Sequence, residues 1–475
     1  MKIENKRING NDLIALGYKE NHTLGAALKI NSKRHGFTRA EMLAKFKSVL
    51  ENPTAYTEDT IFSVLAEAIL GQDVVDATLI ALNEDPVEYT IYGASGIEAG
   101  AKEQMKVAMK LPVTVAGALM PDAHQGYGLP IGGVLATDNA VIPYGVGVDI
   151  GCRMALSIFD LPASLLDTDA ATLKETILKH TRFGAGNGYL KHERVDHAVL
   201  DNKLFAENDL LKSLKDKAWT QLGSSGGGNH FVEFGIVEFV EKDEVLNIEK
   251  GLYLGLLTHS GSRGLGATVA AHYTKLAKTL CKLPYQAQNL AYLDLNTMEG
   301  QEYWLAMNLA GDYASACHEV IHDKIKDALG AELLAKIENH HNFAWKETWN
   351  DREVVVHRKG ATPAAKGVMG IIPGSMATPG FLVRGKGEMA AIQSASHGAG
   401  RLMSRTQAIK TLSAAELKDM LADRGITLLG AGMDEAPMAY KDIHTVMASQ
   451  EELVDVVAKF SPKIVRMADD GSRED

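Results

Sequence analysis

The sequence predicts a mixed α/β fold that carries a small helical segment at its N-terminus. Residues 1 to about 90 place apolar side chains at helical spacing between polar connectors. From about Thr114 the pattern changes to short β-branched runs punctuated by glycine, which is typical of a mixed sheet with functional turns. A chain of 475 residues also exceeds the size at which one hydrophobic core keeps growing. We therefore expect a helical appendage over residues 1–90 and a main domain over residues 91–475.

The individual elements follow from local patterns. In the main domain the runs TVAGALM, GGVLAT and GVGVDI predict strands, because β-branched and small apolar residues alternate with glycine. Residues 314–333 and 414–421 have helical spacing, whereas GLYLGLL and REVVVHR have the composition of strands. The N-terminal helices are predicted from three stretches: DLIALGYKENHTLGAALKI, RAEMLAKFKSVL and DTIFSVLAEAIL.

Composition and charge bound the classes of function. Apolar residues make up 46% and charged residues 23%, which is ordinary for a folded globular protein. The net charge of -11 gives no global basic character, so a polyanionic partner needs a local basic cleft. Three cysteines, an odd number in a long chain, argue against a disulfide framework and fit a reducing compartment. The start MKIENKRING is polar and no run approaches 18 apolar residues, so we expect a cytoplasmic protein without a membrane span.

Candidate metal ligands lie in glycine-rich stretches of the main domain. Asp149 and Cys152 in VDIGC can bend toward one centre, although an isolated D-x-x-C is more often a turn residue and a small buried hydrophobe. His230 follows three glycines and precedes the strand-like FVEF, His259 ends an apolar strand, and His341 lies in NHHN at a helix end. Each histidine alone is more often a hydrogen-bonded structural residue. Together they supply the imidazoles and thiolate that suit Zn, Mn, Fe or Co.

Two further stretches have the features of phosphate-binding turns. HSGSRGLG and HGAGRLMSR each combine a histidine, small residues, an arginine and then helical sequence, which presents backbone N–H groups to an anion. Arg263, Arg401 and Arg405 add forked donors that match phosphate oxygens. His397, oriented by a carboxylate such as Asp122, can attack phosphorus as a nucleophile, and is equally compatible with a role as a further ligand. No Walker A motif occurs, and the G-x-S-x-G at Gly223 leads into a strand rather than the helix that a nucleophile elbow needs.

The chain resembles the RtcB-type RNA ligases, also described as tRNA-splicing or 3'-phosphate RNA ligases, from about Met120 to Arg466. The matching motifs are MPDAHQGYG, PYGVGVDIGC, LGSSGGGNHFVE, THSGSRGLG, HHN, HRKGA, GIIPGSM, SHGAGRLMSR and DEAPMAYKDI.

The resemblance implies a distinctive α/β arrangement with a central cleft that uses two Mn(II) ions and GTP. Cys152 would bridge the two ions, one held also by His259 and His341 and the other by Asp149 and His230. His397 would become guanylylated, with Asp122 orienting it. The implied phosphate and guanylate contacts are Asn229, Glu233, Arg263, Ser375, Ala399, Arg401, Arg405 and Tyr440.

The resemblance also implies a reaction and two departures from the family. GMP on His397 would pass to an RNA 3'-phosphate, obtained where needed from a 2',3'-cyclic phosphate, and a 5'-hydroxyl end would displace it. Arg466 stands where family members commonly have a lysine that contacts the guanylate, and arginine keeps the charge but not the geometry. Residues 1–90 have no counterpart in the shortest members. They are expected either to bind an RNA or protein partner or to pack on the core, and an activating protein remains a candidate partner.

Two other classes compete with the ligase. A two-metal phosphohydrolase or cyclic phosphodiesterase would use the same metals and arginines without needing a guanylylated histidine. An RNA- or ribosome-binding protein would keep only a structural metal site. Cysteine and histidine donors by themselves favour Zn over Mn, so we expect Zn to compete for the site.

Overall fold

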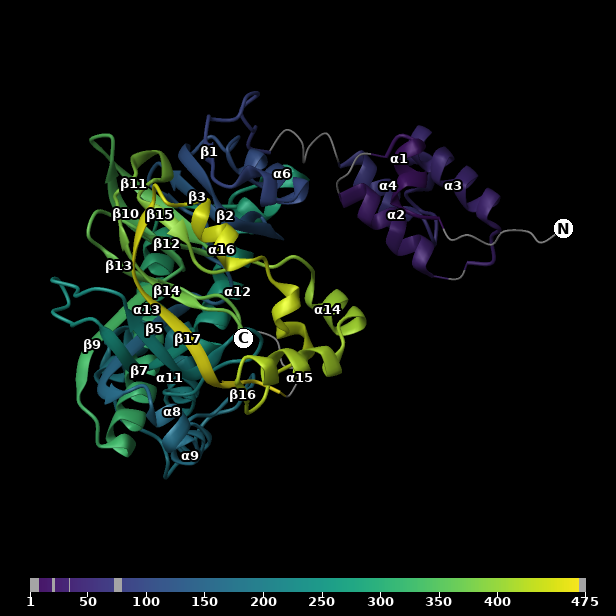
Figure 1. Ribbon diagram of the computed structural model, residues 1–475. Helices are drawn as coiled ribbons and strands as arrows, with labels where there is room; N and C mark the ends of the chain where they lie inside the picture. The colour runs from purple at the N-terminus through teal and green to yellow at the C-terminus, as the bar shows by residue number, and fades with distance from the viewer. Residues whose placement is uncertain (1–7, 19–21, 34, 72–78, 470–475) are drawn as a thin grey trace. The chain divides into compact units, whose positions relative to one another are not determined.

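The computed structural model describes residues 8–18, 22–33, 35–71 and 79–469 and divides the chain into two compact units. The first unit contains the residues up to Leu82 together with Cys281–Gln288, and the second contains Asn83–Leu280 and the chain from Asn289 onward. The described helices include none that is both long enough and apolar enough to span a bilayer. Figure 1 labels the elements of both units.

The first unit is a small helical bundle with an aromatic centre. Phe46 is fully buried and meets Tyr18 and Phe62 edge-on, with ring centroids 6.3 and 5.9 Å apart. Thr38 begins the third helix with a capping box, in which Thr38 and Glu41 satisfy each other's backbone N–H groups. The three N-terminal stretches therefore form helices as predicted. The bounds are α1 (Gly10–Ala15), α2 (His22–Ser32), α3 (Arg39–Glu51), η1 (Pro53–Tyr56) and α4 (Ser63–Leu70).

The second unit is built around an eight-stranded sheet that nearly closes on itself. Its order is β13-β14-β17-β6-β7-β5-β9, with β16 paired to β17. The Asn339 side chain of β9 bonds both the N–H and the C=O of Ile371 in β13, and so links the first strand to the last. The bounds are β5 (Arg153–Pro162), β6 (Phe231–Phe239), β7 (Gly251–Ser260), β9 (Leu333–His340), β13 (Met369–Ile372), β14 (Gly380–Gly385), β16 (Thr427–Leu428) and β17 (Val454–Met467).

Both faces of this sheet are apolar because side chains alternate along each strand. Met154, Leu156 and Ile158 of β5 point into the inner core, which they share with Phe460 of β17. The outer face packs on helices that include α13, whose Ile321 contributes to a second core. Figure 1 shows helices gathered around these strands. The helix bounds are α8 (Leu165–Thr168), α9 (Ala170–His180), α10 (Leu204–Glu207), α11 (Asp209–Gln221), α12 (Arg263–Leu280) and α13 (Met298–Leu329).

A five-stranded sheet of order β1-β2-β3-β11-β10 forms the other layer of the second unit. Two short ribbons, β12-β15 and β4-β8, complete the pairing. The strand bounds are β1 (Thr90–Ile91), β2 (Thr114–Tyr127), β3 (Leu129–Thr137), β4 (Ala140–Val141), β8 (Leu293–Asp294), β10 (Asn342–Trp349), β11 (Arg352–Lys359), β12 (Ala361–Pro363) and β15 (Ser394–Ser396). The remaining α-helices are α6 (Ala99–Ala108), α7 (Pro143–Val146), α14 (Arg405–Thr411), α15 (Ala414–Asp423) and α16 (Ile443–Ala448). The 3-10 turns are η2 (Ala94–Gly96), η3 (Ala198–Asp201), η4 (Tyr285–Leu290), η5 (Met389–Ala391), η6 (Met433–Glu435) and η7 (Pro437–Ala439).

The predicted α/β class is confirmed, and so is a helix over most of residues 314–333, but the bounds of that helix and two other local predictions are wrong. GVGVDI is not a strand: α7 ends at Val146 and a turn carries the chain to β5, because Gly147 and Gly151 adopt positive φ. The helix predicted over residues 314–333 begins at Met298 and ends at Leu329, where Gly330 caps it in the left-handed conformation, and Leu333 opens a strand. His341 consequently lies between strands β9 and β10 rather than at a helix end.

Candidate active site

A cavity of about 320 Å³ collects loops from both sheets of the second unit. It is lined at one side by the turn before β5 and the ends of β6 and β7, and at the other by the segment after β15. Most of the site residues predicted from the sequence line it: Asp149, Cys152, Asn229, Glu233, His259, His341, Ser375, His397, Ala399, Arg401, Arg405 and Tyr440.

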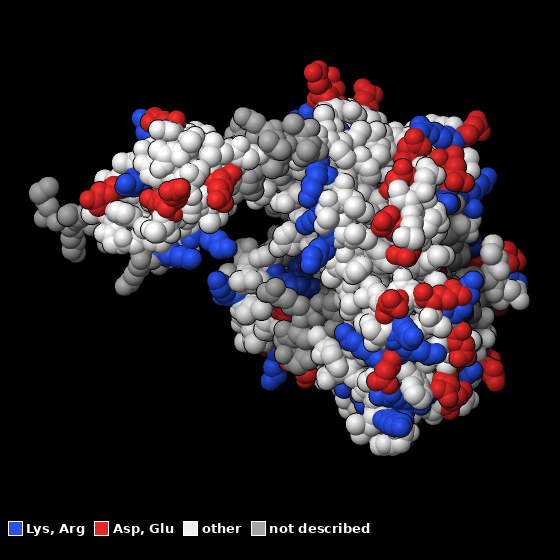
Figure 2. All heavy atoms as spheres, turned by 180° about the vertical axis from the view of Figure 1, so that it is seen from behind, with Lys and Arg blue, Asp and Glu red and all other residues white. Residues whose placement is uncertain are grey.

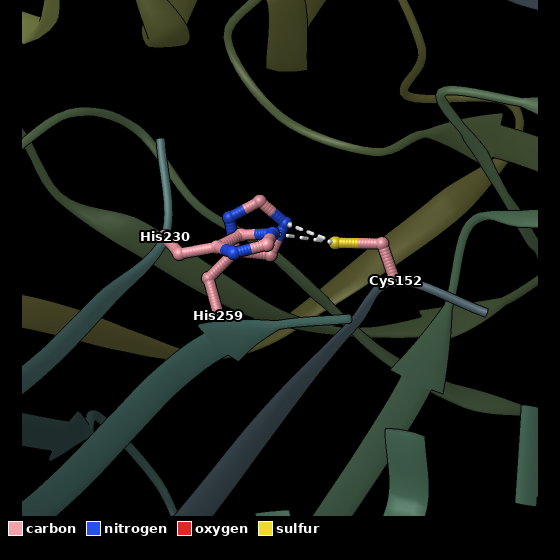
Figure 3. Close-up of side chains that lie close together, drawn as sticks. All are labelled: Cys152, His230 and His259. Carbon is pink, nitrogen blue, oxygen red and sulfur yellow. Dashed lines mark hydrogen bonds between the residues drawn. The ribbon is translucent and has the colours of Figure 1, made fainter. Parts of the chain in front are cut away.

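Three donor atoms converge at the floor of this cavity. The Sγ atom of Cys152 lies 3.4 Å from Nε2 of His230 and 3.1 Å from Nε2 of His259. All three side chains are buried, and their donor atoms lie within 4.8 Å of one another. Figure 3 shows both imidazole rings directed at the sulfur. A thiolate and two imidazoles arranged in this way are a donor set for a transition metal.

A carboxylate and a third imidazole extend this cluster on either side. Nε2 of His230 is 2.9 Å from Oδ2 of Asp149, and Nε2 of His259 is 3.1 Å from Nε2 of His341. The contacts thus run in a chain from Asp149 through His230, Cys152 and His259 to His341. Burial, reinforced by neighbouring imidazoles, holds the pKa of His259 and of His341 well below the ordinary histidine value. Both rings are therefore neutral at pH 7, which is the form that binds metals.

Glycines let the backbone come close to these ligands. Gly151, with φ +68°, lies between the two ligands of the turn, and a Cβ there would meet the backbone of Gly311 in α13 at 2.8 Å. A Cβ at Gly261 would collide with the carboxylate of Asp149. That carboxylate instead accepts a hydrogen bond of 3.1 Å from the backbone N–H of Ser262. The glycine-rich turns seen in the sequence are therefore required by the approach of the backbone to the donor groups.

A histidine–aspartate dyad lies beside the cluster. Nδ1 of His397 is 2.6 Å from Oδ2 of Asp122, and the same oxygen accepts the backbone N–H groups of His397 and Gly398 at 3.2 and 3.3 Å. Burial alone would raise the pKa of Asp122, but the charge and hydrogen bond of His397 bring that pKa below its ordinary value. An ionised carboxylate at Nδ1 favours the tautomer whose lone pair is on Nε2. The His397 ring centroid lies 5.0 Å from that of His341, so the dyad adjoins the donor cluster.

Two of the predicted arginines reach the cavity. Arg401 donates to the backbone oxygen of Asp434 at 2.6 Å and to the Tyr440 hydroxyl at 3.2 Å. Arg405 pairs with the Asp434 carboxylate at 2.8 Å and with Glu435. Forked guanidinium donors held together in this way match phosphate oxygens as well as carboxylates.

Two other predicted arginines do not line the cavity. Arg263 is 1% exposed and donates to Oγ of Ser224 and to the backbone oxygen of Gly184, so it stabilises loops behind the site. Arg466 donates to the backbone oxygens of Leu178 at 3.0 Å and Thr181 at 3.3 Å, and so caps the end of α9. Its neighbours on β17, Val465 and Met467, line the cavity, so strand alternation directs Arg466 to the opposite face.

Three other polar residues of the cavity differ in their burial and hydrogen bonding. Burial raises the pKa of Glu233 well above its ordinary value and so favours the neutral form of its carboxyl. The amide oxygen of Asn229 is buried and has no hydrogen-bond partner among the described residues. The hydroxyl of Ser375 lies 2.9 Å from that of Thr378. Asn229 thus has an acceptor left over for a ligand.

Sequence reasoning missed several residues of the cavity. Glu435, 2% exposed, pairs with Arg401 and Arg405, and lies within the quoted motif DEAPMAYKDI. Lys359, within HRKGA, donates to the backbone oxygens of Tyr127 and Tyr144, and burial lowers its pKa to about 7. Both motifs were visible in the sequence, but nothing in their spacing singled out these side chains.

The α/β fold and this cavity together define a class: an enzyme with a buried thiolate and imidazole cluster beside a histidine–aspartate dyad. The family model described as tRNA-splicing ligase RtcB matches residues 104–468 of the chain. The chain therefore belongs to the RtcB family. The family resemblance predicted from the sequence, and the enzyme class of RNA ligase that it carries, are confirmed.

Several curated relatives are similar over most of their length. The RNA-splicing ligase RtcB of Escherichia coli strain K12 is 35% identical over 410 residues, covering 80% of this chain and 96% of the relative. The RNA-splicing ligase RtcB1 of Escherichia coli strain ATCC 25922 is 34% identical with the same coverage. The tRNA-splicing ligase RtcB of Thermococcus kodakarensis is 30% identical over 431 residues, covering 76% of this chain and 89% of the relative.

Proposed function

We propose that this protein is a GTP- and Mn(II)-dependent RNA ligase that joins a 2',3'-cyclic phosphate or 3'-phosphate end of RNA to a 5'-hydroxyl end. The observation that carries the proposal is the dyad of His397 and Asp122, 2.6 Å apart, in the same cavity as the Cys152 cluster. Membership of the RtcB family supports the ligase class.

The donor set fits two divalent cations that share one thiolate. Asp149, Cys152 and His230 would hold one ion, and Cys152, His259 and His341 the other. Nε2 is the ring nitrogen with which His230 and His341 contact the other donors, so it is the proposed coordinating atom of each ring. The choice of Mn(II) rests on the family, since these donors alone favour Zn. When bound, the two ions would neutralise charge that develops on phosphate oxygens during displacement at phosphorus.

His397 is the proposed nucleophile. Asp122 accepts the Nδ1–H group, so Nε2 offers its lone pair to the α-phosphorus of GTP. The N–P bond forms while the bond to the β-bridging oxygen breaks, and pyrophosphate leaves with that electron pair. Asp122 stabilises the positive charge on the ring without taking the proton itself. The product is GMP attached to His397.

The proposed nucleotide contacts use polar groups around the same cavity. Arg401 and Arg405 now pair with the acidic residues Asp434 and Glu435, and the phosphates of GTP would compete for the same donors. The other proposed contacts to the guanylate are Asn229, Glu233, Ser375, Ala399 and Tyr440.

The RNA steps follow from the same covalent intermediate. A 2',3'-cyclic phosphate is first opened by water to a 3'-phosphate. An oxygen of the 3'-phosphate attacks the phosphorus on His397, the N–P bond breaks, and the RNA acquires an activated (3')pp(5')G end. The oxygen of a 5'-hydroxyl, losing its proton, then attacks the RNA phosphorus, and GMP leaves as the two strands are joined.

Covalent labelling with GTP tests the proposal. Purified full-length protein is incubated with Mn(II) and α-labelled GTP and separated under denaturing conditions, in parallel with His397→Ala. The exposed His192, which lies outside the cavity, provides the matched control His192→Ala. We expect label on the wild type and the control but not on His397→Ala, and transfer of the label to RNA with a 3'-phosphate.

No label under any divalent metal, or label that persists in His397→Ala, would overturn the proposal. The two-metal phosphohydrolase or cyclic phosphodiesterase would then be the better reading, because a hydrolase can use the cluster and the arginines without this dyad.

The proposed setting is RNA repair or tRNA splicing in the cytoplasm. The names of the relatives, RNA-splicing and tRNA-splicing ligase, support this setting. The helical first unit is proposed to be a separate domain that recognises an RNA or an activating protein. Deletion of residues 1–82 would contradict that role if ligation of every RNA substrate were unchanged.

A further inference from the structure

A second depression adjoins the catalytic cavity. It has a volume of about 410 Å³ and is lined by one face of α12, including Thr274, Lys275 and Lys278. Tyr144 and Val148 line both this depression and the cavity, so the two meet at these side chains. We call this depression the α12 groove.

The α12 groove carries positive charge in an acidic protein. Residues 263–280, the whole of α12, contain no aspartate or glutamate. Lys275 is exposed, and Nζ of Lys278 lies 5.6 Å from the Tyr144 ring centroid. Because the net charge of the chain is -11, a basic groove is a local feature. Figure 2 shows Lys and Arg gathered in a band along one edge of the larger unit.

Apolar and aromatic surface lies exposed where the groove meets the cavity. Tyr127, a cavity residue, is 70% exposed and its ring centroid lies 6.4 Å from that of Tyr144, with the rings tilted by 40°. Val148 is 42% exposed. Exposed aromatic rings next to lysines are the combination with which proteins hold unpaired nucleic acid, the bases stacking on the rings and the phosphates meeting the lysines.

We propose that single-stranded RNA whose reacting end lies in the cavity leaves it over Tyr127 and Tyr144 and continues along α12, where Lys275 and Lys278 contact its phosphates. The inference rests on the proposed function, because it takes RNA as the substrate. It commits to an unpaired strand, since bases in a duplex are not free to stack on protein rings.

Binding of a short 3'-phosphorylated single-stranded RNA, measured by fluorescence anisotropy over a range of salt concentrations, tests the groove. Each phosphate contact to a single strand contributes about 0.7 to the slope of log affinity against log salt. The double variant Lys275→Ala/Lys278→Ala should therefore bind more weakly, with a slope shallower by about 1.4. Tyr127→Ala should weaken binding about fivefold to a hundredfold through lost stacking. Lys212→Ala, at an exposed lysine of α11 outside the groove, is the matched control and should bind as the wild type does.

The outcomes separate the groove from the proposed function. An unchanged affinity and salt slope in Lys275→Ala/Lys278→Ala would contradict RNA binding in the α12 groove. The same conclusion would follow if a blunt RNA duplex bound the wild type as tightly as the single strand does and lost as much affinity in this variant. Covalent labelling by GTP needs no RNA and reports that Lys275→Ala/Lys278→Ala is folded, whereas thermal unfolding reports the same for Tyr127→Ala, because Tyr127 lines the catalytic cavity. A wild type that takes no label would refute the proposed function, while the binding comparison would still decide the groove.

Discussion

Replacement of Asp122 by asparagine isolates the charge of the dyad from its geometry. The Oδ2 atom of Asp122 accepts three N–H groups, the Nδ1–H of His397 and the backbone N–H groups of His397 and Gly398. Its other oxygen, Oδ1, is buried and has no hydrogen-bond partner among the described residues. In Asp122→Asn the amide oxygen must occupy the Oδ2 position, because an NH2 group there would face three donors. The tautomer of His397 is therefore kept.

The expected loss in Asp122→Asn is then electrostatic. A hydrogen bond to a charged acceptor is worth about 1.5–3 kcal/mol and one to a neutral acceptor about 0.5–1.5 kcal/mol, so at least about 1 kcal/mol is lost at the His397 contact. Attraction between a carboxylate and an imidazolium about 4 Å apart at an effective dielectric of 20 sets an upper bound of about 4 kcal/mol. Since about 1.4 kcal/mol is a factor of ten in rate, guanylylation of His397 should be about fivefold to a thousandfold slower.

The assay is single-turnover labelling with α-labelled GTP and Mn(II), with thermal unfolding measured on each variant. His397→Ala gives the background, and Asp122→Ala, which leaves three donors without an acceptor, should be slower than Asp122→Asn. Labelling as fast as in the wild type would show that the charge of Asp122 plays no part. A folded Asp122→Asn variant with no label above background would show that the tautomer is lost, and would refute the hydrogen-bond geometry on which the argument depends.

Three further predictions concern the metal cluster, a buried lysine and the arginine of β17. Because the two proposed ion sites share the sulfur of Cys152, Cys152→Ala should bind fewer than two Mn(II) ions per chain in a metal analysis. Asp149→Ala should retain one ion. Two ions in Cys152→Ala would contradict the shared ligand. Burial lowers the pKa of Lys359 from the ordinary lysine value of 10.5 to about 7, so between these pH values the unfolded chain holds a proton that the folded one lacks. The stability of the wild type relative to Lys359→Met, measured by urea unfolding, should therefore rise with pH across that window. A difference that is flat with pH would contradict the burial of the ammonium group. Arg466→Met should lower the free energy of unfolding by about 1–3 kcal/mol, because the cap of α9 is lost. The GTP concentration for half-maximal labelling should stay unchanged. A raised concentration would show that Arg466 contacts the nucleotide.

Much of the candidate site could be predicted because its ligands lie in glycine-rich turns at element ends. Cys152, His230 and His259 each adjoin a strand whose apolar composition is evident in the sequence, and the structure brings them together. Loops at the ends of neighbouring strands share an edge of the sheet, so residues far apart in sequence converge there. What the pattern did not supply was which strands are neighbours, and hence the distances between the donors.

The placement of Arg466 could not be predicted from local sequence. Side chains of a strand alternate between its two faces, so a shift of one residue exchanges the faces. β17 has such an irregularity in its pairing with β6, between Pro462 and Ile464. The bulge depends on tertiary pairing, and it decides that Val465 rather than Arg466 lines the cavity.

Arg263 and Glu435 show a different limit. An arginine in a glycine-rich turn has the same appearance in sequence whether it faces a phosphate or a buried carbonyl, and Arg263 does the latter. Glu435 lies within the motif DEAPMAYKDI, but only the fold brings it to Arg401 and Arg405. Partner choice of long charged side chains depends on three-dimensional neighbours that neither spacing nor composition reveals.

The two members of the dyad are separated by 275 residues of chain, which has a consequence for synthesis. On the ribosome, the segment carrying Asp122 emerges long before the one carrying His397, and His397 itself precedes the strand Val454–Met467 that completes the pairing between β14 and β6. Domains generally fold as units, so a nascent chain interrupted before this strand holds no finished nucleophile. If His397 is the nucleophile proposed above, translation products truncated before this strand would therefore form no covalent adduct with GTP.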